Sequence, residues 1–180
     1  QKRLPMVQID HRLGNQADSV MTDQAEMVHQ AMTHLFARGH RRIGFVSKYP
    51  LEDYLSTQRI QAYRNFVEGH GLESLDYSSK FSVMNLNGMV ERFRQFPAER
   101  PTAILAPDLF ALLLQKRFLA AGYSLPDDLS LVGIDNISAC DFVHPALTSV
   151  DGEYGEVTAA AMLLMEDRIQ NPSRISRKIE

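Results

Sequence analysis

Polar side chains follow several of the short apolar runs in this chain. Asp10 follows one run, Asp108 follows another, and Asp135 and Asn136 follow a third. A carboxylate accepts hydrogen bonds from hydroxyl groups or from ring nitrogens that carry a proton, and an amide both donates and accepts. Arg59 adds a guanidinium, whose fork of donors can hold two vicinal hydroxyls or a carboxylate. Groups of these kinds are suited to recognising a small polar molecule.

The motifs of common enzyme classes are absent from the sequence. It has no Gly-x-Gly-x-x-Gly string, no P-loop and no Gly-x-Ser-x-Gly elbow, so phosphate-binding and serine-hydrolase sites lack their main parts. His29, His34 and His40 do not form the i, i+4 pair of a helical zinc site. Cys140 is the only cysteine and has no evident activating base beside it. We therefore expect no enzyme, no metal site and no cofactor.

Length and composition indicate a globular protein. The 180 residues are enough for one ordinary domain, or slightly more, with a sizeable core. A hydrophobic share of 44% and a charged share of 23% are ordinary, and no apolar run approaches the roughly 20 residues of a membrane span. The net charge of -3 provides no basic face for nucleic acid. The presence of a single cysteine favours a reducing, cytoplasmic setting. The first residues contain neither an initiator Met nor a signal peptide, as is expected of a fragment.

Short β-rich runs alternate with longer helical patterns along the chain. Apolar residues recur at helical spacing between Asp23 and Gly39, where the glycine is placed as a C-cap. Further helices are expected at 57–69, 88–96, 108–121 and 154–169, and strands at 6–10, 19–22, 42–47, 81–83, 103–106, 129–134 and 147–150. Strands that are apolar throughout and joined by helices indicate a parallel sheet covered on both faces. The predicted fold class is α/β.

The carboxyl ends of parallel strands are where such sheets bind their ligands. This rule selects Asp10, the segment 47–59, the region of Phe81, Asp108 and Asp135. Simpler explanations exist for several of them. Asp108 can cap a helix N-terminus, Asp135 can start a loop as an Asx-turn, and Phe81 can pack in the core.

Four strings in the sequence are specific enough to identify a family when they are taken together. They are Gly39–Val46, Ser56–Tyr63, Pro126–Asn136 and Pro145–Val150. In this order and at these intervals they resemble the LacI/GalR family of bacterial transcription regulators. The resemblance implies a periplasmic-binding-protein-like fold of type I, in which two α/β subdomains close on an effector held between them.

The resemblance also implies how the chain is divided. Residues 1–12 resemble the terminal strand of a truncated first subdomain, residues 13–150 the second, effector-binding subdomain, and residues 151–180 the helix and tail that return toward the first. Most of the first subdomain, and the helix-turn-helix domain upstream of it, are expected to lie outside the chain. We therefore expect effector binding by these residues alone to be weak or undetectable.

The resemblance assigns effector contacts to particular residues. Arg59 matches the arginine that reaches into the family's cleft, and Asp135 matches the aspartate directly after the apolar strand. Ser56, Phe81 and Asp108 are further candidates, as a hydroxyl near the arginine, an aromatic face and a carboxylate at a strand end. The alternative for Arg59 is a solvated arginine on the first turn of a helix.

Residues 109–114 are apolar at six successive positions, which on a helix covers the full circumference rather than one stripe. One side can face the sheet, and the other needs cover. An entirely internal helix would explain the run. In the family, however, this helix contributes to a dimer interface, which implies that Leu109, Leu112 and Leu113 contact a second copy.

The function that the resemblance implies is the sensing of a small effector, a sugar or a nucleobase-like metabolite, by a transcriptional regulator. Effector binding would change the angle between subdomains in a homodimer, which contacts operator DNA only through a domain outside this chain. Two alternatives are a periplasmic sugar-binding protein of an ABC transporter, which shares the fold, and a Rossmann-type enzyme. The enzyme would need a phosphate loop or a catalytic pair. We expect a cytoplasmic location and no contact with a membrane.

Overall fold

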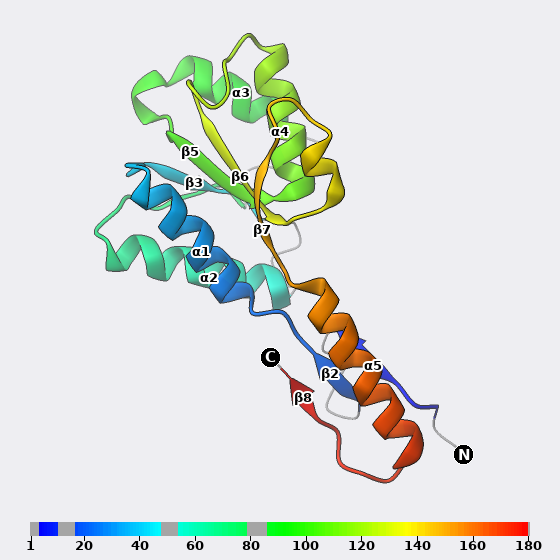
Figure 1. Ribbon diagram of the computed structural model, residues 1–180. Coiled ribbons are helices and arrows are strands. Elements are labelled where there is room, and N and C mark those ends of the chain that lie inside the picture. Colours follow the sequence, from blue (N-terminus) through cyan, green and yellow to red (C-terminus); the bar gives the residue numbers. More distant parts are fainter. Residues whose placement is uncertain (1–3, 11–16, 48–53, 79–85, 180) are drawn as a thin grey trace. The chain divides into compact units, whose positions relative to one another are not determined.

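The computed structural model describes residues 4–10, 17–47, 54–78 and 86–179 (Figure 1). Its contacts divide the chain into a smaller unit, residues 1–23 with 152–180, and a larger unit, residues 24–151. The sequence-based division after residue 12 differs from this one, because the strand at 18–20 pairs with the first strand of the chain. In the described part of the chain, every helix is too short or too polar to cross a membrane.

A five-stranded parallel sheet forms the centre of the larger unit (Figure 1). Its strands are β3 (Ile43–Phe45), β4 (Leu75–Asp76), β5 (Ala103–Pro107), β6 (Ser130–Asp135) and β7 (Thr148–Asp151). They lie in the order β4-β3-β5-β6-β7, and every neighbouring pair runs parallel. Since the strands share one direction, their carboxyl ends meet at one edge. The predicted α/β fold with a parallel sheet is confirmed.

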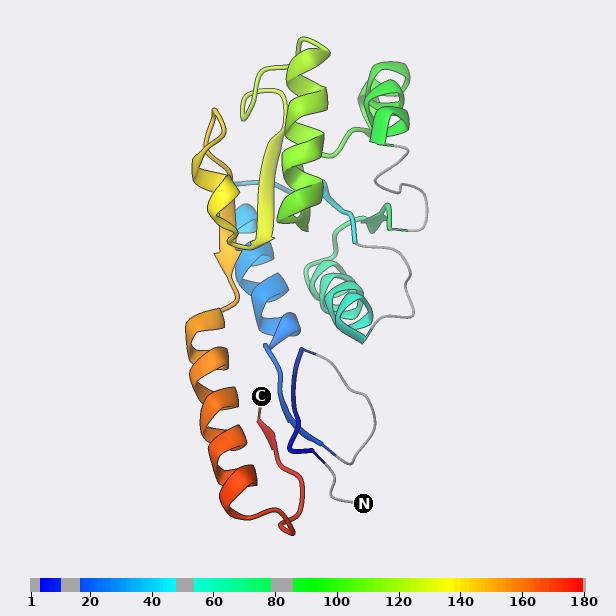
Figure 2. The same ribbon diagram turned by 90° about the vertical axis from the view of Figure 1, so that its right-hand side faces the viewer.

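Helices cover both faces of this sheet, as the sequence predicts. The pairs are α1 (Gln24–Ala37) with α2 (Tyr54–Gly69) on one face and α3 (Leu86–Gln95) with α4 (Asp108–Ala120) on the other (Figures 1 and 2). Along β5, Ala103 and Leu105 belong to the apolar cluster of the first pair. Ile104 and Ala106 belong to that of the second. Because both faces are buried, the strand is apolar throughout instead of alternating with polar residues.

The first helix ends at the glycine that the sequence places there. Gly39 has a φ of 92°, in the left-handed region that favours glycine. The His40 amide donates to the Leu35 carbonyl at 3.1 Å, which closes a Schellman turn. This turn directs the chain into β3.

Tyr63 fixes α2 to two strands at once. It is fully buried, and its ring stacks on Phe45 with the centroids 4.9 Å apart. Its hydroxyl donates to the Ile43 carbonyl (2.9 Å) and accepts from the Leu75 amide (2.8 Å). Burial raises the pKa of Tyr63 to about 12, so the hydroxyl keeps its proton at neutral pH. Arg59 is on the same helix, so the contacts of Tyr63 also fix the position of Arg59 relative to the sheet.

Several elements differ from the expected ones. The sequence pattern misses β4 because two residues are too few to show a period. It also misses the short 3-10 helices Pro97–Glu99 and Ser138–Asp141. α2 begins at Tyr54 rather than at Thr57. The expected strand at 81–83 lies outside the described residues.

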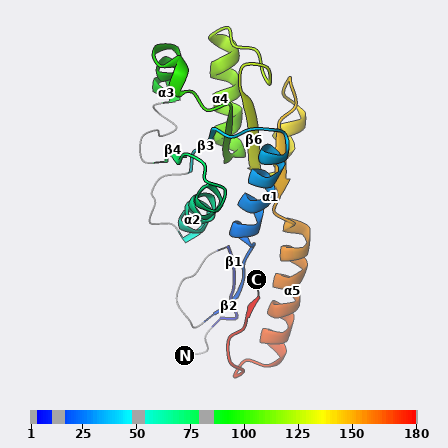
Figure 3. The same ribbon diagram turned by 90° about the vertical axis from the view of Figure 1, so that its left-hand side faces the viewer.

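The smaller unit is a parallel sheet with one helix packed along it (Figures 1 and 3). Its elements are β1 (Val7–Ile9), β2 (Asp18–Val20), β8 (Lys178–Ile179) and α5 (Tyr154–Gln170), with the strands in the order β1-β2-β8. Val157, Ala161 and Leu164 of α5 form a buried cluster with Val20 of β2. The sequence pattern does not predict β8, a strand of only two residues.

A buried carboxylate ties the C-terminal tail to this sheet. Asp18 is 0% exposed and accepts hydrogen bonds from the guanidinium groups of Arg168 and Arg174, at 2.7–3.0 Å, and from the Arg177 amide at 2.7 Å. Burial alone would raise the pKa of Asp18, but these hydrogen bonds outweigh it and hold the pKa well below its usual range. The ionised carboxylate therefore adds stability that is present above its unfolded-state pKa. That stability is lost as the pH falls through the lower folded-state pKa.

Asp18→Asn should detach the tail from β2. The substitution removes the negative partner of two guanidinium groups, and breaking a buried ion pair in this way costs roughly 3–5 kcal/mol. We expect the amides of Ser19 and Met21, which donate to carbonyls of the tail, to lose protection in hydrogen-exchange NMR. Glu166→Gln, which removes an exposed carboxylate from α5, should leave that protection unchanged. Full protection in Asp18→Asn would mean that other contacts hold the tail.

Candidate functional site

The carboxyl edge of the larger sheet carries a polar residue after each strand. Ser47 follows β3, Ser78 follows β4, Asp108 follows β5, and Asp135 and Asp151 end β6 and β7. The Ser47 amide donates to the Ser78 hydroxyl at 3.0 Å, which links the first two of these ends. Parallel sheets bind ligands at this edge.

The structure brings Arg59 and Asp135 together. Nη2 of Arg59 donates to Oδ1 of Asp135 at 2.6 Å, although 76 residues separate the two in sequence. Nε of Arg59 donates to Oε1 of Gln24, at the start of α1. Arg59 is 8% exposed, and the Asp135 side chain is 26% exposed. A buried guanidinium donor and a partly exposed carboxylate acceptor therefore lie side by side.

Asp135 and Asn136 form a turn with an unusual backbone. Their φ angles are 112° and 48°, in a region that side chains other than glycine seldom adopt and that Asp and Asn tolerate best. The Asn136 amide donates to Oγ of Ser149 (3.0 Å), and its side-chain Nδ2 donates to Oδ2 of Asp151 (3.1 Å). Contacts with β7 thus hold the turn that presents the Asp135 carboxylate to Arg59.

Asp108 holds this turn in place through buried hydrogen bonds. The residue is 1% exposed. Its Oδ2 accepts from the Ile137 amide (2.7 Å), and its Oδ1 accepts from the Ser149 hydroxyl (2.5 Å). Burial raises the pKa of Asp108, and the hydrogen bonds from Ser149, Ile137 and Cys140 oppose that rise. The carboxylate joins the ends of β5, β6 and β7.

Gly133 makes room for the Asp108 carboxylate. A Cβ at this position of β6 would lie 1.9 Å from Oδ1 of Asp108 and 2.9 Å from Oγ of Ser149. These distances are far below van der Waals contact, so only a residue without a side chain fits beside the Asp108 carboxylate. The sequence places Gly133 inside an apolar strand without revealing what approaches it.

The other predicted effector contacts lie in different surroundings. Ser56 is one turn before Arg59 on α2 and is 4% exposed. Phe81 lies outside the described residues, as do residues 48–53. Asp10 follows β1 in the smaller unit, where its carboxylate accepts from the amide (2.7 Å) and the hydroxyl (2.9 Å) of Thr22.

Sequence reasoning missed three members of the network at the sheet edge. They are Gln24, Ser149 and Asp151. Asp151 follows an expected strand, so the strand-end rule selects it once the end of that strand is known. Ser149 lies within its strand and Gln24 opens a helix, and nothing in their local sequence marks them.

The predicted interface residues of α4 differ in exposure. Leu109 is 59% exposed, whereas Leu112 and Leu113 are half-buried against the apolar cluster of α3 and α4. Two more apolar side chains are exposed in the segment after β6, Ile137 at 39% and Phe142 at 84%. Ile137 lies near the start of α4, because its amide bonds to Asp108, the neighbour of Leu109.

The Cys140 thiol and the grouping of acidic side chains bear on nucleophilic reactivity and on metal binding. Burial raises the pKa of Cys140 to about 12, with a further contribution from its hydrogen bond to Asp108, so the thiol stays protonated and unreactive. Within the described ranges, His, Cys, Asp and Glu side chains form no group of three or more that could hold a metal ion.

Gly133→Ala should disrupt the Asp108 network. The new methyl group displaces the carboxylate from Ile137 and Ser149, and leaving a buried charged group without its partners costs roughly 3 kcal/mol of unfolding free energy. Urea unfolding monitored by circular dichroism measures the loss. Gly69→Ala is a matched control, since a Cβ there meets nothing within 4 Å. If the two variants were equally stable, Asp108 would not constrain the sheet edge as described.

The chain is similar to known proteins along most of its length. Residues 32–180 match the model of the periplasmic binding protein-like domain. The chain is 27% identical over 163 residues to the NTD biosynthesis operon regulator NtdR of Bacillus subtilis, an alignment that covers 87% of this chain and 48% of that protein. It is 29% identical over 156 residues to the transcriptional repressor CytR of Escherichia coli, with coverage of 84% and 45%. The chain thus spans about half the length of these curated relatives.

Solved structures show the same relationship. The complex of the transcriptional regulator CelR with cellobiose matches with a TM-score of 0.81 at 25% identity, covering 96% of this chain and 54% of that one. A LacI family transcriptional regulator from Enterococcus faecium with bound ribose has the same fold, with a TM-score of 0.82 at 23% identity and coverage of 97% and 66%. The chain therefore belongs to the periplasmic binding protein-like domain family, and it is similar to part of several LacI-type transcriptional regulators.

Proposed function

We propose that this chain senses a small polar metabolite, a sugar or a nucleobase-like molecule, for a LacI-type transcriptional regulator. The observation that carries the proposal is the 2.6 Å pair of Arg59 and Asp135 at the carboxyl edge of the sheet. The guanidinium can donate to one ligand hydroxyl while the carboxylate accepts from its neighbour, which is the pattern that vicinal hydroxyls require. The relative CelR, which forms a complex with cellobiose, supports a sugar as the first class to test.

The existing contacts of Arg59 favour binding. Gln24 and Asp135 already hold Nε and Nη2 of the guanidinium. A side chain fixed before binding loses little rotamer entropy when the ligand arrives. Ser56 and Phe81 complete the proposed site as a hydroxyl and an aromatic contact. Asp108 belongs to it through the turn that it supports, since only 1% of the residue is exposed.

The proposal places the sensor in a complete regulator. Effector binding shifts the population between two conformations, and linkage makes effector affinity and operator affinity depend on each other. Operator DNA is contacted through a helix-turn-helix domain outside this chain, so the protein works in the cytoplasm. The alternative of a periplasmic sugar-binding protein is less favoured, because NtdR and CytR are transcriptional regulators.

A thermal-shift screen of the complete protein in which this chain occurs tests the site. Sugars and nucleosides are screened first, and the best ligand is then titrated against Arg59→Ala and Asp135→Ala. Each variant should weaken binding by about 10- to 100-fold, because each removes a charge-assisted hydrogen bond to the ligand. The 180-residue chain alone should show a much smaller stabilisation.

Arg64→Ala is the matched control for this experiment. Arg64 lies on the same helix as Arg59, its side chain is 56% exposed, and it pairs with Asp76 rather than with Asp135. The control should keep the affinity of the parent. Equal stabilisation of parent, Arg59→Ala and Asp135→Ala would remove the site from the proposal, and the absence of any ligand would favour a protein partner instead.

The proposal includes a homodimer formed through α4. Leu109, Leu112 and Leu113, together with the exposed side chains of Ile137 and Phe142, form the apolar surface that a second copy would cover. Burial of these side chains stabilises association in proportion to the apolar area removed from water.

Leu109→Glu should convert the dimer to monomers. A carboxylate buried in an apolar interface costs several kcal/mol, which weakens the dimer by about 100-fold or more. Sedimentation velocity measures the change. Leu119→Glu makes the same substitution near the other end of α4, at a side chain 38% exposed, and should leave the dimer intact. If Leu109→Glu were as dimeric as the parent, α4 would not form the interface.

A further inference from the structure

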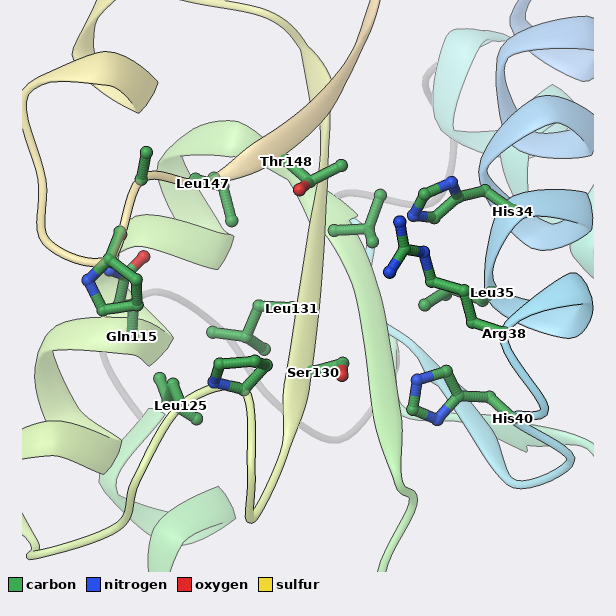
Figure 4. A pocket seen from close by; sticks show the side chains of 14 residues that line it. His34, Leu35, Arg38, His40, Gln115, Leu125, Ser130, Leu131, Leu147 and Thr148 are labelled. Carbon is green, nitrogen blue, oxygen red and sulfur yellow. The ribbon is translucent and has the colours of Figure 1, made fainter.

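A pocket lies at the amino edge of the larger sheet, opposite the effector residues (Figure 4). It has a volume of about 280 Å³ and is lined by the starts of β6 and β7, at residues 130–132 and 147–148. Asp135 is the last residue of β6. Because the strands are parallel, a molecule in this pocket and a ligand on Arg59 and Asp135 would occupy opposite edges of one sheet.

One wall of the pocket is basic. His34 from the last turn of α1 lies together with Arg38 and His40, from the turn after it, on one side in Figure 4. The 14 lining residues, all within the described ranges, include no Asp or Glu. Burial lowers the pKa of His40, and repulsion from His34 and Arg38 lowers it further. The repulsion, the smaller of these causes, reflects basic groups gathered close together.

The opposite wall is apolar. Figure 4 shows Leu125 and Leu147 across the pocket from the basic side chains, with Leu131 between them. Gln115 fixes this wall, since its Nε2 donates to the Pro145 carbonyl at 2.6 Å. The pocket therefore offers charge on one side and a rigid apolar surface on the other.

We propose that this pocket binds a small organic anion, with its carboxylate or phosphate at Arg38, His34 and His40 and its apolar part on Leu125, Leu131 and Leu147. Arg38 is exposed, and among the described residues no carboxylate forms an ion pair with it. Its guanidinium is therefore available to form a fork with a carboxylate or phosphate. The volume is near the lower end of small-molecule sites, which limits the ligand to one ring or a short chain.

The probes are benzoate, phenyl phosphate and benzamide, which is the neutral counterpart of benzoate. Each is titrated into the chain and followed by amide shifts in ¹H–¹⁵N NMR. We expect saturable shifts at His40, Leu131 and Thr148 with at least one anion, and none with benzamide. The tighter of the two anions identifies the carboxylate or the phosphate as the group recognised.

Arg38→Gln should weaken anion binding by about tenfold, the usual effect of losing one charge-assisted hydrogen bond. Arg94→Gln removes an exposed guanidinium of α3 that does not line the pocket and should change nothing. Arg59→Ala should also leave the affinity for the anion unchanged, so the result does not depend on the proposed effector site. Benzamide binding as tight as benzoate, an unchanged affinity in Arg38→Gln, or no saturable shift with either anion would overturn the proposal.

The pH dependence provides a second measurement. The groups that act on His40 are His34 of α1, Arg38 just after that helix and, at 2.9 Å from Nδ1, the Thr102 hydroxyl. The pocket lining from β6 and β7 is uncharged. A bound anion beside His40 opposes the lowering of its pKa, so binding takes up protons. Affinity should therefore increase as the pH falls from about 8 to about 6. Affinity independent of pH over this range would contradict contact with the histidines.

Discussion

The carboxylate of Asp108 is removed from solvent and must find its hydrogen-bond donors inside the protein. It finds them on the Ile137 amide and the Ser149 hydroxyl, and so joins the ends of β5, β6 and β7. Gly133 is required for the same reason, since any side chain there would occupy the space of the carboxylate. The arrangement of the carboxyl ends of these three strands depends on satisfying this one buried group.

The pairing of Arg59 with Asp135 depends on two separate anchors. The turn that presents Asp135 is held by the network of Asp108 and Ser149, although its backbone adopts φ angles that are unfavourable for most residues. The helix that presents Arg59 is held by Tyr63, whose hydroxyl bridges β3 and β4. Because Asp108 and Tyr63 are both buried, contacts within the protein set the positions of the donor and the acceptor. A site that is preformed in this way suits a sensor that must discriminate among similar small molecules.

The two edges of the larger sheet offer different chemistry. The carboxyl edge has a balanced donor and acceptor, Arg59 and Asp135, and suits a neutral ligand rich in hydroxyl groups. The amino edge has His34, Arg38 and His40 without a carboxylate, and suits an anion. The same parallel arrangement separates them, because the two edges lie at opposite ends of every strand. Ligands of the two classes would therefore not compete for the same atoms.

The sequence alone determined the fold class, because apolar runs such as Ala103–Ala106 separated by helical periods are typical of a parallel sheet covered on both faces. It also placed Asp135 at a strand end, since that depends on local position, whereas Arg59, on α2, was selected by the resemblance to the family. The partners of those residues were decided only by the tertiary structure. Gln24 and Ser149 are ordinary residues in sequence, and β4 is too short to leave a pattern. Hydrogen bonds across 76 residues depend on how strands and helices pack, and no local spacing records that packing.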